Sequence, residues 1–184
     1  EIRDEETASL VIHAALTGHV VLSTLHTSNT LGVIPRLIDM GIQPFLIPPT
    51  LNIAIAQRLI RKLCPYCKKR IKPKREVKEL IFKEIDALPP LIKKSVKIPK
   101  SFHLYEPVGC KRCNNTGYSG RVGIFEILEM TDRLAEIVLK KPSESEIRKE
   151  ARRQGMVTMK QDGILKVLNG ISSLEEVLRV AEGK

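Results

Sequence analysis

The sequence of 184 residues contains no tryptophan, three tyrosines and four phenylalanines, so few rings are available to stack on nucleic-acid bases. It also lacks a long apolar run. The longest stretch without Asp, Glu, Lys or Arg, residues 7–35, is interrupted by His, Gly, Ser, Thr and Asn, and residues 40–57 contain three prolines. Neither stretch has the roughly 20 apolar residues of a membrane-spanning helix. Because no secretory signal is visible either, we expect a soluble intracellular protein.

The remaining composition is that of a globular protein. A hydrophobic fraction of 42% with 28% charged residues excludes a disordered or collagen-like chain. The chain opens without methionine, at Glu1 in an acidic turn. This opening indicates a piece of a longer polypeptide.

Basic residues are concentrated in one block. The chain has 31 Lys or Arg and 21 Asp or Glu, a net charge of +10. Residues 58–112 hold 17 of the basic and 5 of the acidic side chains, whereas the rest of the chain sums to −2. Such a block suits contact with nucleic acid or with anionic lipid headgroups, or it is a solvated face. Any function of the charge belongs to this segment and not to the whole chain.

Helix and strand signals alternate in the first 63 residues. Asp4 resembles a helix N-cap, with Glu5 and Glu6 in the first turn and Gly18 just past the helix end. The pattern after Gly18 predicts a buried strand at Val20–Leu25, a helix from Asn29 or Thr30 to Met40, a helix at Thr50–Ile55, and a strand or helix end at Gln57–Leu63. Helix, buried strand and helix in succession are typical of an α/β domain with a parallel sheet.

Residues 64–113 form a Lys-rich insertion bounded by cysteines. A helix is predicted from about Arg75 to Ala87, with loops at Pro89-Pro90 and at Lys93–Lys100. The insertion is followed by an apolar run at Val122–Leu128 and then by a helical tail.

Glycines and capping signals divide the tail. Gly155 and Gly170 are expected to separate three helices. Two pairs have the spacing of a capping box: Ser143 with Glu146, and Ser173 with Glu176.

The four cysteines form two CxxC pairs, Cys64 with Cys67 and Cys110 with Cys113. Two such knuckles make the closed tetrahedral S₄ site that structural zinc prefers. The 42 residues between the pairs exceed the roughly 15–20 of a compact zinc ribbon, so we expect a ribbon with an extended loop. Basic neighbours such as Lys68, Lys69 and Arg112 would help to keep the thiols deprotonated. Disulfides or a redox dithiol are the alternatives, and an intracellular protein disfavours the former.

Two histidines flank the predicted strand, His19 before it and His26 at its end. Because the carboxyl ends of parallel strands line the ligand crevice, His26 lies where ligands bind, although a structural role remains open. Glu1 is a carboxylate that could hold Mg²⁺ or orient water beside a phosphate. His13 and His103 are interpreted as structural.

Several motifs in the same order resemble one family: EIRDEETA at 1–8, LTGHVVLSTLHT at 16–27, RLIDMG at 36–41, AQRLIR at 56–61, the two CxxC pairs, and Asp162-Gly with NGISSLEEV at 169–177. They are similar to the C-terminal half of the secretion ATPases, which comprise type II secretion protein E and the type IV pilus assembly (extension) ATPases. The resemblance covers essentially all 184 residues and is weakest at 75–105.

The resemblance implies roles for particular residues. Glu1 corresponds to the Walker B glutamate, the catalytic carboxylate, and His19 and His26 to the histidine box, with His26 near the γ-phosphate. Arg3 lies in the same turn as Glu1 and would couple the nucleotide site to its neighbours. The four cysteines correspond to the zinc-binding tetracysteine knuckle, which the related retraction ATPases generally lack. The implied cofactors are ATP, Mg²⁺ and Zn²⁺.

The implied fold is the C-terminal part of a RecA-like P-loop ATPase core of the α/β class. It would comprise a partial core at 1–63, a metal-binding insertion at 64–120, and a return strand with a helical subdomain at 121–184. The implied function is ATP hydrolysis that drives type IV pilus assembly or type II secretion. A homo-hexamer in the cytoplasm, peripheral to the inner membrane, would act on a platform protein together with cytoplasmic assembly factors.

One departure from the family is decisive for activity. No GxxxxGK[ST] phosphate loop occurs in the 184 residues, so this chain alone is not expected to hydrolyse ATP. The alternative function is a zinc-ribbon module that binds nucleic acid without motor activity. The scarcity of aromatic residues argues against it, and we expect no nucleic-acid partner.

Overall fold

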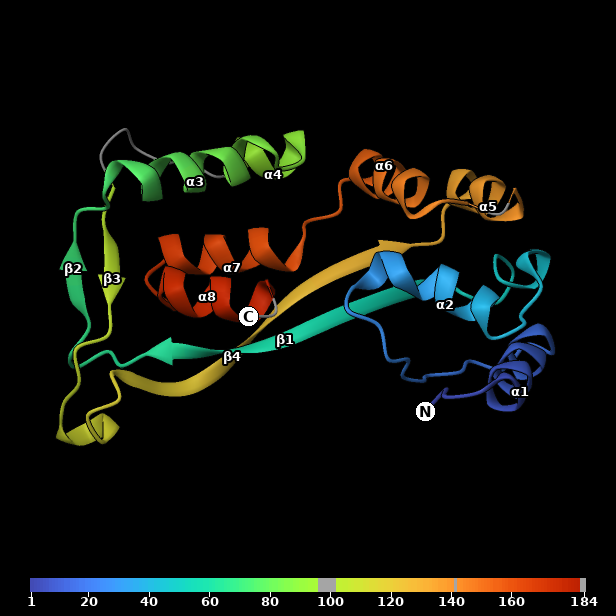
Figure 1. The fold of residues 1–184 in the computed structure, drawn as a ribbon, viewed down its shortest axis with the longest axis horizontal. Coiled ribbons are helices and arrows are strands. Elements are labelled where there is room, and N and C mark those ends of the chain that lie inside the picture. The colour runs from blue at the N-terminus through green and yellow to red at the C-terminus, as the bar shows by residue number, and fades with distance from the viewer. Residues whose placement is uncertain (96–101, 141, 183–184) are drawn as a thin grey trace. The chain divides into compact units, whose positions relative to one another are not determined.

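The computed structural model describes residues 1–95, 102–140 and 142–182 as a mixed α/β chain (Figure 1). The chain divides into two compact units. Unit 1 comprises Glu1–Ala56 and Ile127–Met156, and unit 2 comprises Gln57–Glu126 and Val157–Lys184. The division expected from the sequence, at 1–63, 64–120 and 121–184, separates the chain by the functional part that each segment would form. It stays a prediction.

Unit 1 is built mainly of helices. They are α1 (Glu5–Leu16), α2 (Val33–Asp39), α5 (Asp132–Leu139) and α6 (Glu144–Gln154), with short 3-10 turns η1 (Thr30–Gly32) and η2 (Pro44–Leu46). Their apolar faces form one core, which holds fully buried Ala8, Ile34, Ile47, Val138, Ile147 and Ala151. Burial of this kind contributes about 25 cal/mol for each Å² of apolar surface removed from water.

Unit 2 contains the cysteines and most of the strands. Its helices are α3 (Arg75–Asp86), α4 (Pro90–Ser95), α7 (Met159–Leu168) and α8 (Leu174–Ala181), and the turn η3 spans Lys111–Cys113. Strands β2 (Lys69–Ile71) and β3 (Leu104–Glu106) pair antiparallel, with Lys69 opposite Glu106. Helices α7 and α8 lie side by side (Figure 1).

The long strands β1 (Ile53–Leu63) and β4 (Tyr118–Glu129) pair in a second two-stranded sheet and run in opposite directions (Figure 1). The division between the units falls within both strands. At the amino end of β1, buried Ala54 lies between exposed Ile53 and Ile55, the alternation of a strand with one covered face.

The first helix agrees with its sequence signals. Helix α1 begins after Asp4, whose Oδ1 accepts a hydrogen bond from the Thr7 N–H at 2.8 Å. It ends before Gly18, whose φ of +89° is the left-handed conformation that glycine adopts readily. Asn29 caps the next segment by accepting from the Gly32 N–H at 3.0 Å, although a 3-10 turn precedes the α-helix there.

Two predictions for the first 63 residues were wrong. Among the described residues, Val20–Leu25 forms a single parallel bridge, Ile2 to Leu25, and no strand, and Val20 and Leu22 are more than 90% exposed. The apolar run is not a buried strand here because no described element covers these side chains. Thr50–Ile55 is not a helix, since β1 begins at Ile53.

The insertion and the tail mostly agree with the predictions. Helix α3 confirms the predicted helix, whereas α4 begins at Pro90, where a loop was expected. Residues 96–100 of that predicted loop lie outside the described residues. The described part of the tail has four helices rather than three, because α5 and α6 are separate. Gly155 and Gly170 end α6 and α7 with φ of +88° and +66°.

Candidate metal centre and acidic–histidine pair

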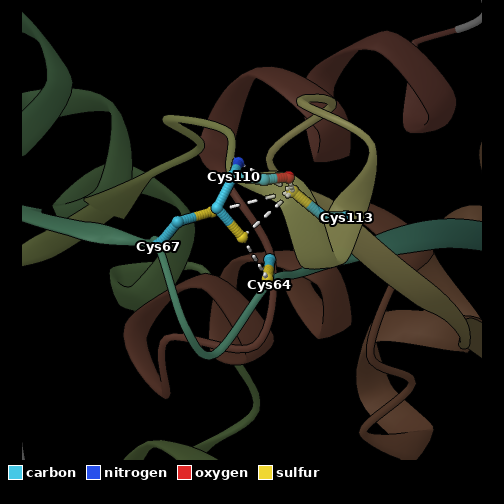
Figure 2. A group of neighbouring side chains, drawn as sticks. All are labelled: Cys64, Cys67, Cys110 and Cys113. Atoms are coloured by element: carbon cyan, nitrogen blue, oxygen red, sulfur yellow. Dashed lines mark hydrogen bonds between the residues drawn. The ribbon is translucent and has the colours of Figure 1, made fainter.

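The four cysteines come together in unit 2 (Figure 2). Cys64 and Cys67 occupy the turn that follows β1, where the Lys68 N–H donates to the Cys64 carbonyl at 3.1 Å. Cys110 directly precedes the turn η3, and Cys113 is its last residue. All four Sγ atoms lie within 4.8 Å of one another, and Figure 2 shows the side chains converging from the two turns.

The sulfur spacing fits a tetrahedral metal site. The Sγ–Sγ distances are 4.0 Å for Cys64–Cys110, 3.8 Å for Cys67–Cys113 and 3.7 Å for Cys110–Cys113. A regular tetrahedron with metal–sulfur distances of about 2.3 Å has edges of about 3.8 Å. The thiols are free, and Cys64 and Cys113 are buried. The donor set and its spacing therefore suit zinc, which would be held by these four sulfurs.

The backbone of the second knuckle depends on the residues on either side of its two cysteines. Asn114 and Asn115 both have positive φ, 52° and 59°, a conformation that asparagine tolerates better than most residues. Gly109 and Gly117 also have positive φ, and a Cβ on Gly117 would lie 2.4 Å from the Cβ of Pro107. The Asn-Asn pair was a local signal for this turn, but the approach of Pro107 was not visible in the sequence.

Backbone N–H groups stabilise a thiolate at Cys113. Burial alone would raise the pKa of this thiol, but the N–H groups of Cys110 and Gly117 donate to its Sγ at 3.2 and 3.3 Å and lower the pKa to about 6. Burial raises the pKa of Cys67 to about 11. Cys113 thus ionises at a lower pH than Cys67.

The basic neighbours make other contacts. The Lys68 ammonium donates to the Gly170 carbonyl at 2.8 Å and lies 4.6 Å from the centre of the Tyr105 ring. The Arg112 guanidinium lies 4.0 Å from the centre of the Tyr66 ring. These cations hold the surroundings of the knuckle in place through cation–π contacts and a hydrogen bond.

The base of the knuckle is tied to the turn between α7 and α8. The Leu63 N–H donates to the Ile171 carbonyl at 2.8 Å, and the Ser172 hydroxyl donates to the Arg61 carbonyl at 2.8 Å. The Cys64 N–H donates to the Gly117 carbonyl at 3.0 Å. A change at the metal site would therefore reach the two C-terminal helices.

Glu176 strengthens this junction, a role that its capping-box spacing with Ser173 does not indicate. Its side chain is fully buried and accepts from the Arg61 N–H and guanidinium and from the Arg179 guanidinium, at 2.6–3.0 Å. Burial alone would raise its pKa, but the two arginines lower it to about 2. Ser173 caps α8, but the reciprocal half of the box is absent because Glu176 points to Arg61.

A second cluster, in unit 1, contains three of the residues selected from the sequence. The Ile2 N–H donates to the Thr24 carbonyl at 2.8 Å and thereby brings Glu1 beside His26. The Glu1 carboxylate is hydrogen-bonded to His26 Nε2 and to the Arg3 guanidinium. The Arg3 guanidinium, with a further contribution from His26, lowers the pKa of Glu1, so this carboxylate is ionised near neutral pH.

His19 does not join this cluster. Its Nδ1 is hydrogen-bonded to the Ala14 carbonyl at 3.2 Å and to the Thr17 hydroxyl at 3.0 Å, which places the ring at the C-terminal end of α1. The structure therefore brings Glu1, Arg3 and His26 together and leaves His19 apart from them.

Residues 1–179 match the family described as Type II/IV secretion system protein. The chain belongs to this family. It is 47% identical over 178 residues to the type IV pilus assembly ATPase PilB of Myxococcus xanthus, covering 97% of the chain and 30% of that protein. It is 43% identical over 182 residues to the type II secretion system ATPase E of Vibrio cholerae, covering 99% of the chain and 33% of that protein.

The fold of this secretion-family chain is similar to that of a solved structure, the ATPase DotB of Legionella pneumophila. The match has a TM-score of 0.59 at 22% identity and covers 100% of the chain and 37% of DotB. The chain thus spans about a third of the length of the proteins it matches. Among the described residues, no helix is long and apolar enough to cross a membrane.

Proposed function

We propose that this chain is part of an ATPase that couples ATP hydrolysis to type IV pilus assembly or type II protein secretion. The observation that supports this function most directly is the family match over residues 1–179, together with relatives that are named as ATPases of these two systems. The match favours a motor over a zinc-ribbon module that binds nucleic acid. The core would be RecA-like.

Glu1 and His26 are proposed to act at the nucleotide. The Glu1 carboxylate, ionised beside Arg3, would hold Mg²⁺ or orient the attacking water, and His26 would stabilise charge that develops on the γ-phosphate. Bound Mg²⁺ would supply a positive charge at the phosphates. Arg3 would keep Glu1 ionised and oriented. His19, at the end of α1, would take part in nucleotide binding only in another arrangement of the 19–26 segment.

The four cysteines are proposed to hold structural zinc, which would supply a cross-link between the two knuckles. The proposed assembly is a homo-hexamer in the cytoplasm at the periphery of the inner membrane, where a platform protein and cytoplasmic assembly factors are its partners. Because the 184 residues contain no phosphate loop, the chain alone would not turn over ATP.

The test is Glu1→Gln in the full-length protein. Removing the carboxylate charge should lower ATP turnover by at least about 100-fold, as expected for loss of a group that acts in the transition state, while nucleotide affinity changes little. Glu6→Gln is the matched control, since Glu6 is an exposed carboxylate in the first turn of α1 and should leave turnover unchanged. Unchanged turnover in Glu1→Gln would reject the proposed role.

A further inference from the structure

A hollow of about 590 Å³ opens on unit 2, beside the second cysteine knuckle. Its lining comes from β1, from the start of β4 and from the turn between η3 and β4: Leu59, Arg61, Thr116, Tyr118, Ser119, Gly120 and Arg121. None of these residues has a part in the proposed ATP chemistry, and none is acidic. Two of them carry guanidinium groups.

Two residues that line the hollow, Arg61 and Tyr118, are held in place by contacts within unit 2. The Arg61 guanidinium lies 4.1 Å from the centre of the Tyr118 ring and donates to Glu176 Oε2 at 2.6 Å. The Tyr118 hydroxyl is hydrogen-bonded to the Ser173 hydroxyl at 2.8 Å. Groups that are ordered before binding lose less conformational entropy when a ligand arrives. Arg61 and Tyr118 are therefore ordered before a ligand binds.

The rim is shaped by an interruption in β4. Gly120 has a φ of +75°, and Ser119, Gly120 and Arg121 are exposed in succession instead of alternating. Such local interruptions of a strand re-aim side chains. Within residues 1–95, 102–140 and 142–182, the Arg121 guanidinium has no hydrogen-bond or ion-pair partner. Its guanidinium remains available for bidentate pairing with a carboxylate.

The surroundings combine positive charge with one exposed apolar side chain. Residues 59–62 and 116–121 contain three basic residues, Arg61, Lys62 and Arg121, and no acidic one. The charge of Glu176 is matched by Arg61 and Arg179. The hydrogen bond to Glu176 raises the pKa of Arg61, with a smaller contribution from the negative charge of Glu175. Leu59 is 59% exposed and lines the hollow.

We propose that this hollow binds an acidic segment of a partner protein in an extended conformation. Carboxylates of the segment would pair with Arg121 and Arg61, and an aliphatic side chain would pack on Leu59. Arginine and tyrosine beside an apolar contact are typical of the centre of a protein interface. The proposal does not depend on ATP hydrolysis.

Two other anionic partners fit the hollow less well. A nucleic acid uses free aromatic faces for stacking, whereas one face of Tyr118 is covered by Arg61. A lipid bilayer meets projecting cations, whereas this surface is concave and includes Leu59. An inserted peptide satisfies the charge, the concavity and the apolar side chain together.

The test uses the full-length, zinc-loaded protein and a fluorescein-labelled peptide of alternating Glu and Leu, read by fluorescence anisotropy. The same peptide with Gln in place of Glu should bind at least about tenfold more weakly, because it lacks the carboxylates. Arg121→Glu should also weaken binding of the acidic peptide at least about tenfold, and Leu59→Thr by a smaller factor. If Arg121→Glu does not fold, Arg121→Gln carries the test.

Arg58→Glu is the matched control, because Arg58 is an exposed arginine of β1 outside the hollow and the charge change is the same. It should change affinity by less than about twofold. Equal weakening by Arg58→Glu and Arg121→Glu would overturn the proposal in favour of unspecific charge attraction. The proposal would also be overturned if the acidic peptide did not bind. The same holds if the protein bound only a single-stranded oligonucleotide, or only vesicles of anionic phospholipid.

Discussion

At the scale of single residues, buried charge is the feature with the largest expected consequence. The Glu176 carboxylate is fully buried and accepts its hydrogen bonds from Arg61 and Arg179. Removing one partner of a buried ion pair leaves uncompensated charge, which typically costs several kcal/mol. The arginines themselves reach solvent, so they can rehydrate in part when Glu176 is changed.

Glu176→Gln should therefore lower the free energy of unfolding by about 3 kcal/mol. The measurement is urea denaturation at neutral pH. Glu175→Gln is the control, since Glu175 is the exposed neighbour in the first turn of the same helix, and it should cost less than about 1 kcal/mol. Equal effects of the two variants would contradict a special role for the buried carboxylate.

The same residue predicts a pH dependence. The pKa of Glu176 falls from an ordinary 4.5 to about 2 in the folded protein. A lowered folded pKa stabilises the fold above the unfolded pKa, and this contribution is lost as pH falls from about 4.5 towards about 2. The difference in unfolding free energy between wild type and Glu176→Gln should therefore shrink over this range. If this difference in unfolding free energy stayed constant from neutral pH to pH 3, the lowered pKa of Glu176 would be contradicted.

At the scale of helices and strands, features set by residues close in sequence could be predicted, and features that depend on distant residues could not. Asp4 and the Ser143–Glu146 capping box could be recognised because a cap involves residues within one turn, and both caps are present. The strand at Ile53 was misread as a helix because its period depends on which face the rest of the molecule covers. The predicted burial of Val20 and Leu22 failed for the same reason.

The candidate sites follow the same division. The CxxC spacing predicted the metal cluster because each pair is set by one tight turn. The pairing of Glu1 with His26 was only implied by resemblance, and the structure produces it through a hydrogen bond between Ile2 and Thr24. The contact of Arg61 with Glu176 joins residues 115 positions apart, and nothing in the local sequence of either indicates the other.

The packing of α7 on α8 gives a prediction for an element. A Cβ at Gly163 would lie 2.4 Å from Val177 Cγ1, so Gly163→Ala should force the helices apart and lower the free energy of unfolding by about 1–3 kcal/mol. Thermal denaturation measures the effect. Gly32→Ala is the control, since its φ is −78° and its nearest new neighbour would be 3.6 Å away.

The double variant Gly163→Ala with Val177→Ala separates crowding from other effects of the new methyl group. Val177→Ala alone leaves a cavity, but it also removes the atoms that the new Cβ would meet. The double variant should thus be more stable than the sum of the two single effects predicts. Simple additivity would mean that the helix contact is not the cause.

At the scale of the whole molecule, positive charge and the four cysteines of the candidate metal centre are both concentrated in unit 2. Unit 2 carries 22 basic and 10 acidic residues, whereas unit 1 carries 9 and 11. The net charge of +10 is therefore a property of the unit that contains the knuckle. Since all four cysteines also belong to unit 2, loss of metal should affect the two units unequally.

Removal of the metal should loosen unit 2 and spare unit 1. The purified protein should contain about one equivalent of zinc, and a chelator should remove it with loss of local structure, because a structural site contributes of the order of 10 kcal/mol of binding free energy. Hydrogen exchange should then rise near Cys64 and Cys110 and, through the bonds of Leu63 and Arg61 to the α7–α8 turn, around residues 171–176. Exchange within the unit 1 core, around Ile34 and Ile147, should stay unchanged.

Adding back Zn²⁺ should restore protection and adding Mg²⁺ should not, since thiolates bind the softer ion. A metal-free protein with full protection around residues 64–117 would show that the knuckle holds its shape by hydrogen bonds alone.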